Sequence, residues 1–203
     1  MRLACVFIFI FLSFLSNAQS QCYLKISGGS MSFSYPLDIG GYGIYPEYSV
    51  VPGKHNSSYW RHFQLSGEFA FEKGSREYIV MILPETDYKR AVYHISDVSV
   101  HARLSYYPIG ATFLKGLYVA IGPTAGYYFY SREIKETNLP VSGGLVLSRL
   151  QTNPANNAFI GYKISVGYEF YFKRFLLGAR LDWGNDQIGN IKTMYGAKIG
   201  WKL

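Results

Sequence analysis

The stretch IKTMYGAKIGWKL, residues 191–203, alternates between two kinds of side chain. Its odd-numbered positions are mostly apolar or aromatic, whereas its even-numbered positions include three lysines and two glycines. Successive side chains of a β-strand point to opposite faces, whereas a helix with 3.6 residues per turn would mix the two sets. The stretch therefore predicts a strand with one apolar and one polar face.

The same two-faced pattern recurs along the chain and predicts an all-β fold. It is clearest over residues 60–72, 97–107, 117–130, 158–172 and 175–183. Two weaker candidates are residues 77–83, apolar on both faces, and residues 23–35, interrupted by Gly28-Gly29. Together these stretches predict eight antiparallel strands. Residues 141–150 also alternate in part, which leaves a barrel of ten strands as the alternative.

The predicted connections alternate in length. The short ones are residues 73–76, 108–116 and 173–174, and the long ones are residues 36–59, 84–94 and 131–157, with a shorter polar connection at residues 184–190. Short turns at one rim and long loops at the other are typical of outer-membrane barrels. An even number of strands joined in this way places both termini at the short-turn rim, which is the periplasmic side.

The start of the chain predicts export. A positive residue, Arg2, precedes an apolar run over residues 3–15, and Ser16-Asn17-Ala18 forms a small-x-small cleavage site. We expect a signal peptide over residues 1–18 and a barrel domain over residues 19–203. Cys22 would then be the one cysteine of the mature chain, so no internal disulfide is expected. After residue 18 no apolar run approaches the length of a membrane helix, so a membrane location requires a closed barrel.

Charge decides which face of the strands meets lipid. The nine residues predicted to form a polar network are His62, Glu68, His101, Arg103, Lys163, Glu169, Arg180, Asp182 and Lys198, and the same face carries Glu72 and Asp97. One Lys or Arg facing lipid at the midplane costs about 2–4 kcal/mol, and several would exceed a domain's stability of about 5–15 kcal/mol. The charged face is therefore predicted to line the lumen. An eight-stranded barrel leaves just enough room for side chains, so we expect a plugged interior.

The alternative for these charges is the solvated face of a soluble sheet, but the sequence supplies no partner layer for the opposite face. Aromatic residues near the predicted strand ends favour the membrane. Rings with a polar tip prefer the lipid–water boundary. The predicted interfacial residues are Tyr59, Trp60, Tyr106, Tyr127, Trp183 and Trp201.

Enzymatic, metal and nucleic-acid functions find little support in the sequence. The four histidines, His55, His62, His94 and His101, lack the close spacing of metal ligands, and no His follows residue 101 to serve a late-strand catalytic set. The chain carries a net charge of +7, but its Lys and Arg residues form no basic stripe. We therefore predict no catalytic residues, no metal site, no cofactor and no nucleic-acid partner.

The signal ending Ser16-Asn17-Ala18-Gln19, the Tyr- and Gly-rich strands, and the final Gly196-x-x-x-Gly200-Trp201-Lys202-Leu203 resemble the small outer-membrane β-barrel (porin-family-like) proteins common in Bacteroidetes. The OmpX protein and the OmpA membrane domain share that architecture. The resemblance implies a monomeric barrel of the cell outer membrane, in contact with lipid and lipopolysaccharide.

The predicted function is structural or surface-interacting, through long extracellular loops at residues 36–59 and 131–157. Two alternatives stay open: an accessory barrel of a secretion or gliding machinery of the PorT type, with periplasmic or secretion partners, and a narrow porin-like channel. A soluble lipocalin-like barrel is a further alternative, but residues 19–40 lack its Gly-x-Trp signature.

Overall fold

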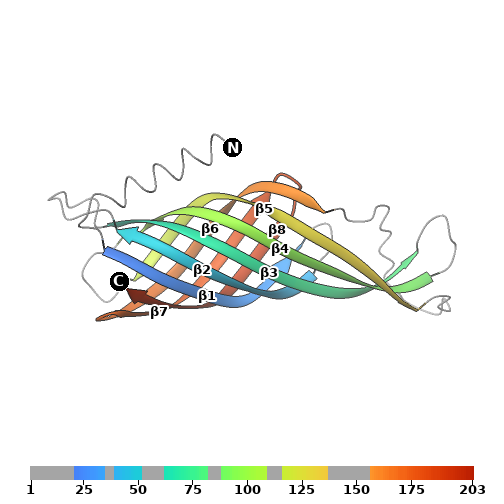
Figure 1. Cartoon of the computed structure of the whole chain (residues 1–203), viewed down its shortest axis with the longest axis horizontal. Coiled ribbons are helices and arrows are strands. Elements are labelled where there is room, and N and C mark those ends of the chain that lie inside the picture. The colour runs from blue at the N-terminus through green and yellow to red at the C-terminus, as the bar shows by residue number, and fades with distance from the viewer. Residues whose placement is uncertain (1–20, 35–38, 52–61, 82–87, 109–115, 137–155) are drawn as a thin grey trace.

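The computed structural model describes residues 21–34, 39–51, 62–81, 88–108, 116–136 and 156–203. These ranges form one closed, all-antiparallel barrel of eight strands, in which each strand pairs with the next and the last pairs with the first (Figure 1). The strands are β1 (Gln21–Phe33), β2 (Ile39–Val51), β3 (Phe63–Met81), β4 (Tyr88–Tyr106), β5 (Leu117–Glu136), β6 (Asn157–Phe172), β7 (Phe175–Asp186) and β8 (Ile191–Lys202). The predicted fold class is confirmed.

The alternation in sequence becomes an alternation between exterior and lumen. On β8, Tyr195 and Ile199 point outward with exposed fractions of 63% and 54%, whereas Met194 and Lys198 are buried inside the barrel. β8 closes the barrel against β1, from Tyr23 opposite Lys202 to Phe33 opposite Lys192. Within the described ranges, no helix is long and apolar enough to cross a membrane.

The predicted turn at residues 73–76 is wrong, because β3 runs through it as one strand of 19 residues. Gly74, which suggested a turn, pairs with Gly41 of β2 and with Ile95 of β4. A Cβ at Gly74 would lie 2.8 Å from the carbonyl oxygen of Gly40. The glycine therefore permits close packing within the sheet rather than a reversal of the chain. The predicted strands 60–72 and 77–83 are two halves of β3.

The predicted long loop at residues 36–59 is also wrong, because it contains β2. Pro46 and the glycines at 40, 41 and 43 hid this strand. Pro46 has no N–H to donate, and the β2–β3 pairing is interrupted between Ile44 and Glu47. The missed strand and the split strand offset each other, so the predicted count of eight is right although two of its members are wrong.

Two other predicted loops are shorter than expected. β4 begins at Tyr88, inside the predicted loop 84–94, and β5 continues to Glu136, inside the predicted loop 131–157. The stretch 141–150, on which the ten-strand alternative depended, lies outside the described residues.

The two rims of the barrel differ. We call the rim with Gln21, Lys202 and the β6–β7 turn at Lys173-Arg174 the terminal rim. At the opposite rim, β3, β4 and β5 reach well past the other strands (Figure 1). The β2–β3 ladder ends at Gly74 and the β5–β6 ladder ends at Tyr128. Beyond these points, residues 75–81, 88–94 and 131–136 form a three-stranded projection, the extended sheet.

The lumen is layered along the barrel axis. Apolar and aromatic side chains pack together in the half nearer the extended sheet, including Met31, Phe33, Tyr93, Tyr128 and Phe159. Charged side chains fill the half nearer the terminal rim. The sequence predicted only charges, hydroxyls and small residues inside the barrel, so it did not predict this aromatic layer.

Candidate functional site

The buried charges of the lumen are the most distinctive feature of the barrel. Six cations and seven carboxylates point inward from every strand except β5: Lys25, Arg103, Lys163, Arg180, Lys192 and Lys198, with Glu47, Glu68, Glu72, Asp97, Glu169, Asp182 and Asp186. They reach the lumen because they occupy the inward positions of their strands, one residue in two.

Eight of the nine residues predicted for the polar network are buried in this lumen. The ninth, His62, lies half-buried at the terminal rim, just before β3. Its Nδ1 is 2.7 Å from the carbonyl oxygen of Tyr107, so it joins two chain segments rather than the central network. His101 is buried deeper, with its Nε2 atom 3.2 Å from the Ser99 hydroxyl.

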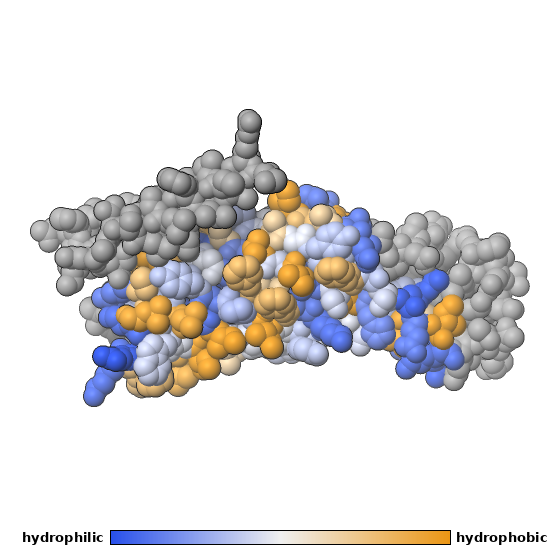
Figure 2. All heavy atoms as spheres, in the orientation of Figure 1, coloured by the Kyte–Doolittle hydropathy of each residue, from blue (hydrophilic) through white to orange (hydrophobic). Residues whose placement is uncertain are grey.

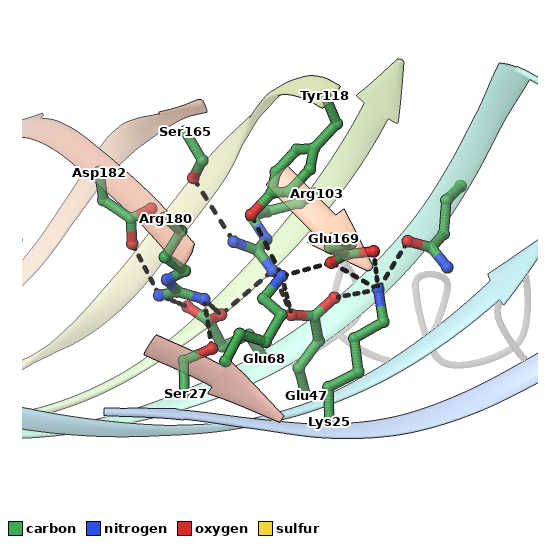
Figure 3. Close-up of polar contacts among 12 residues, drawn as sticks. Lys25, Ser27, Glu47, Glu68, Arg103, Tyr118, Ser165, Glu169, Arg180 and Asp182 are labelled. Carbon is green, nitrogen blue, oxygen red and sulfur yellow. Dashed lines mark hydrogen bonds and ion pairs between the residues drawn. The ribbon is translucent and has the colours of Figure 1, made fainter. Parts of the chain in front are cut away.

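Glu68 on β3 is the centre of the network (Figure 3). Both terminal nitrogens of Arg180 donate to its carboxylate, Arg103 approaches it at 3.2 Å, and Lys163 at 3.0 Å. Arg180 also binds Asp182 at 2.7 Å. These partners come from β4, β6 and β7, so one carboxylate ties together strands from opposite sides of the barrel.

A second cluster lies closer to the terminal rim and is continuous with the first. Lys25 and Lys198 bind Glu169 at 3.0 and 2.9 Å, and both also approach Glu47. Arg103 links the clusters because it binds Glu47 at 2.6 Å as well as Glu68. Each of the three glutamates thus contacts at least two cations, which offsets the large cost of removing a carboxylate from water.

Tyrosine hydroxyls complete this cluster. The Tyr107 hydroxyl lies 2.9 Å from Glu169, and the Tyr118 hydroxyl accepts a hydrogen bond from Lys198 at 3.2 Å. Burial and the adjacent Glu169 carboxylate raise the pKa of Tyr107 well above its ordinary value, so its phenol keeps its proton and can donate.

A third cluster lies in the aromatic half of the lumen. The Lys192 ammonium pairs with Asp97 and, at 3.1 Å, with Glu72. It also lies 4.6 Å from the ring centres of Tyr128 and Phe159, a cation–π arrangement. Tyr45 connects this cluster to the centre, because its hydroxyl donates to Glu72 while Arg180 lies over its ring.

Sequence reasoning missed four of the thirteen lumen charges. Glu47 and Asp186 lay in predicted loops, and Lys25 lay in a weakly patterned strand. Lys192 was visible on the polar face of residues 191–203, but its distance from the other charges in the sequence gave no reason to single it out. The spacing of Lys25 and Glu47 on the inward positions of β1 and β2 was the available signal.

The exterior of the barrel is apolar around its middle. Figure 2 shows hydrophobic residues spread over the visible face of the barrel. Exposed apolar side chains include Ile26, Ile44, Phe71, Val100, Ile121, Val166 and Leu181. Such a surface would be unstable in water, and a lipid environment removes that cost.

The predicted interfacial aromatics fall near both ends of this apolar band. Tyr106 and Trp201 lie near the terminal rim, whereas Tyr127 and Trp183 lie toward the extended sheet, and all four are exposed. Tyr59 and Trp60 lie outside the described residues. The structure adds Tyr42, Tyr162 and Tyr195 to the exposed aromatics on the side of the extended sheet.

The extended sheet has a different surface from the barrel. Glu77 pairs with Arg90 at 3.2 Å, and His94 approaches Glu133 at 3.9 Å. Glu133, Ile134 and Lys135 are exposed. This mixture of charges resembles the surface of a water-soluble sheet.

No set of three or more His, Cys, Asp or Glu side chains in the described part of the chain is arranged to hold a metal ion. The three described histidines lie apart, with His62 at the terminal rim, His101 in the lumen and His94 on the extended sheet, and His55 is outside the described residues.

Comparison with known proteins finds similarity of structure alone. The chain matches no protein-family model and no curated protein. It is similar to the Yersinia pestis attachment invasion locus protein Ail, solved with the heparin analogue sucrose octasulfate, with 9% identity, a TM-score of 0.45, and coverage of 91% of this chain and 99% of Ail. For Neisserial surface protein A (NspA) these values are 10%, 0.47, 90% and 97%. For Ail in a phospholipid bilayer nanodisc they are 14%, 0.38, 91% and 100%.

Proposed function

We propose that the protein is an integral barrel of the bacterial outer membrane, with a filled lumen and a surface-interaction role carried by the extended sheet. The observation that carries this proposal is the contrast between three surfaces of one barrel. The middle of the exterior is apolar, the interior is charged, and the sheet beyond one rim is again polar and charged.

The membrane location rests on energetics. The lumen holds thirteen Lys, Arg, Asp and Glu side chains that lipid would reject, while the exterior presents apolar side chains that water would reject. A closed barrel also leaves no unpaired strand edge in the hydrocarbon layer, since β8 pairs with β1. Both conditions are met together only in a bilayer.

The filled lumen rests on the ion pairs. A water-filled pore needs side chains that stand away from one another, whereas here Glu68 contacts Arg103 of the neighbouring strand and Arg180 from across the barrel. The porin-like channel of the sequence analysis is therefore disfavoured. The accessory role in a secretion machinery has no specific support among the contacts of the described residues.

The interaction role rests on the shape of the extended sheet. A barrel that only spans a bilayer needs strands of about 9–11 residues, yet β3, β4 and β5 have 19, 19 and 20. The additional length holds charged side chains, including Glu77, Arg90 and Glu133, in a rigid paired sheet outside the apolar band. We infer that this sheet faces the exterior of the cell and that the terminal rim faces the periplasm.

Cysteine labelling of intact cells tests this arrangement. Glu133→Cys on the extended sheet and Lys173→Cys at the terminal rim are placed singly in a Cys22→Ser background. A membrane-impermeant maleimide should label the first variant on intact cells and the second only after the outer membrane is permeabilised. Labelling of Lys173→Cys on intact cells, with Glu133→Cys protected, would contradict the proposed orientation.

Removal of residues 77–92 tests the interaction role. If bacteria that carry the shortened protein adhere less to other cells than bacteria that carry the parent protein, the result supports the interaction role, and unchanged adhesion would contradict it.

A further inference from the structure

A small cavity lies inside the lumen, between the central network and the aromatic layer. Its volume is about 30 Å³. Four buried polar atoms with no hydrogen-bond partner among the described residues belong to inward-facing residues that line it: His101 Nδ1, Thr124 Oγ1, Asp182 Oδ1 and Asn190 Oδ1. Native proteins leave few such atoms, so four around one cavity indicate a site for something that satisfies them.

The chemistry of these atoms restricts the occupant. Two of the four, Asp182 Oδ1 and Asn190 Oδ1, are carboxylate or amide oxygens, which accept hydrogen bonds or bind cations but cannot donate. The amide of Asn190 cannot be reversed without loss, because its Nδ2 donates to Asp186 at 3.2 Å. The occupant must therefore present positive charge or hydrogen-bond donors toward an oxygen-rich wall.

The charges of the lumen favour a cation. The thirteen ionisable groups named above leave one more carboxylate than cation. The cavity lies at the acidic end of the lumen, where Glu72, Asp97 and Asp186 face the single ammonium of Lys192, whereas the other nine groups comprise five cations and four carboxylates. Among the described residues, Asp186 accepts hydrogen bonds from neutral donors alone, which are the Tyr128 hydroxyl, two backbone amides and the Asn190 amide.

Two lysines also line the cavity, and the ammonium group of each is already paired with two carboxylates. The Lys163 ammonium lies 3.0 Å from Glu68 and 3.4 Å from Asp182 Oδ2, and the Lys192 ammonium is held by Glu72 and Asp97. Asp182 therefore uses one oxygen for Lys163 and Arg180, and its other oxygen is the one that lacks a partner. Over the thirteen lumen groups together, one monovalent ion would cancel the net surplus of one carboxylate, whereas a divalent ion would reverse it.

We propose that this cavity binds one small monovalent cation of the size of sodium, with Asp182, Asn190 and Thr124 as the oxygen ligands. Hard cations take carboxylate, amide and hydroxyl oxygens as ligands. A water needs a cavity of at least about 10–15 Å³, so a volume of about 30 Å³ accommodates a bare ion with one water. The site lies between β5, β7 and the start of β8, and the cation would hold these strands together.

The test uses the folded full-length barrel in detergent. The temperature at which the folded form disappears from a heat-modifiability gel is measured in sodium, lithium, potassium and N-methyl-D-glucamine chloride at equal ionic strength. We expect the midpoint to rise with sodium concentration and to stay constant with N-methyl-D-glucamine, which is too large to enter. Thr124→Val removes one ligand oxygen with little change of shape and should raise the sodium concentration for half of the effect by about tenfold.

Ser66→Ala is the matched control. Its hydroxyl is also buried without a partner among the described residues, but it does not line the cavity, so this variant should respond to sodium as the parent does. A midpoint that is the same in all four salts would overturn the proposal and assign the cavity to water alone. An equal loss of the sodium response in both variants would also overturn it. If Thr124→Val fails to fold, the comparison of salts on the parent protein decides in the same way.

Discussion

Replacing Glu68 by Gln should severely destabilise the barrel. The substitution keeps the shape of the side chain and removes its charge, so Arg103, Arg180 and Lys163 lose the carboxylate they share. Removing one partner of a buried ion pair costs about 3–5 kcal/mol, because the remaining charges stay buried. Against a total stability of about 5–15 kcal/mol, this is a large fraction.

Urea unfolding of the barrel in lipid vesicles measures this change, with tryptophan fluorescence and gel mobility as independent signals. Glu77→Gln is the matched control, because Glu77 pairs with Arg90 at 3.2 Å on the extended sheet with side chains 48% and 39% exposed. An exposed pair of this kind contributes about 0–1 kcal/mol. The two glutamines should therefore differ in cost by several kcal/mol.

A second substitution tests the cause of the loss. Adding Lys163→Met to Glu68→Gln removes one of the uncompensated cations and should restore part of the lost stability. Equal, small effects of Glu68→Gln and Glu77→Gln would refute the reasoning, because they would mean that water reaches Glu68 and that the lumen is not filled.

Three other predictions concern the exterior, the packing and the permeability of the barrel. Phe71→Arg places a charge on the lipid-facing side of β3 and should cost about 2–4 kcal/mol in vesicle unfolding, whereas Phe71→Leu should cost much less. Gly29→Ala should destabilise the barrel by about 1–3 kcal/mol, because a Cβ there would lie 2.1 Å from the Tyr195 carbonyl oxygen, while Gly40→Ala, with no atom within 4 Å, should be nearly neutral in the same urea titration. The parent protein should give no steady conductance in planar bilayers, and a variant combining Glu68→Ala, Arg103→Ala and Arg180→Ala should conduct. A parent that conducts as well as this variant would contradict the filled lumen.

Much of the fold follows from the sequence because membrane barrels expose a simple pattern. β6, β7 and β8 alternate without interruption, and their predicted limits agree with the structure within about three residues. β2 was hidden by Pro46 and three glycines, and β3 was divided at Gly74. In both strands, residues that usually mark turns lie inside a strand and allow close packing against the neighbouring strands. This role depends on the assembled barrel, so the sequence alone does not reveal it.

For the charged network, the sequence predicts which way a side chain faces but does not predict which side chain it contacts. Alternation predicts that Glu68 and Arg180 face inward, since that depends on the parity of their positions. It does not predict that they meet, because 112 residues separate them and their contact depends on the register of every strand between them. The aromatic layer was missed for a related reason, since several of its members lie in stretches that were read as loops.

The extended sheet is built from three strands that follow one another in the chain, β3, β4 and β5. Its height is therefore encoded in one contiguous stretch of sequence. Adding or removing two residues on each side of a hairpin would lengthen or shorten the projection without altering which side chains face inward below it, because the repeat of a strand is two residues. Evolution can thus tune how far this protein reaches from the membrane while the charged interior that holds the barrel together stays under separate constraint.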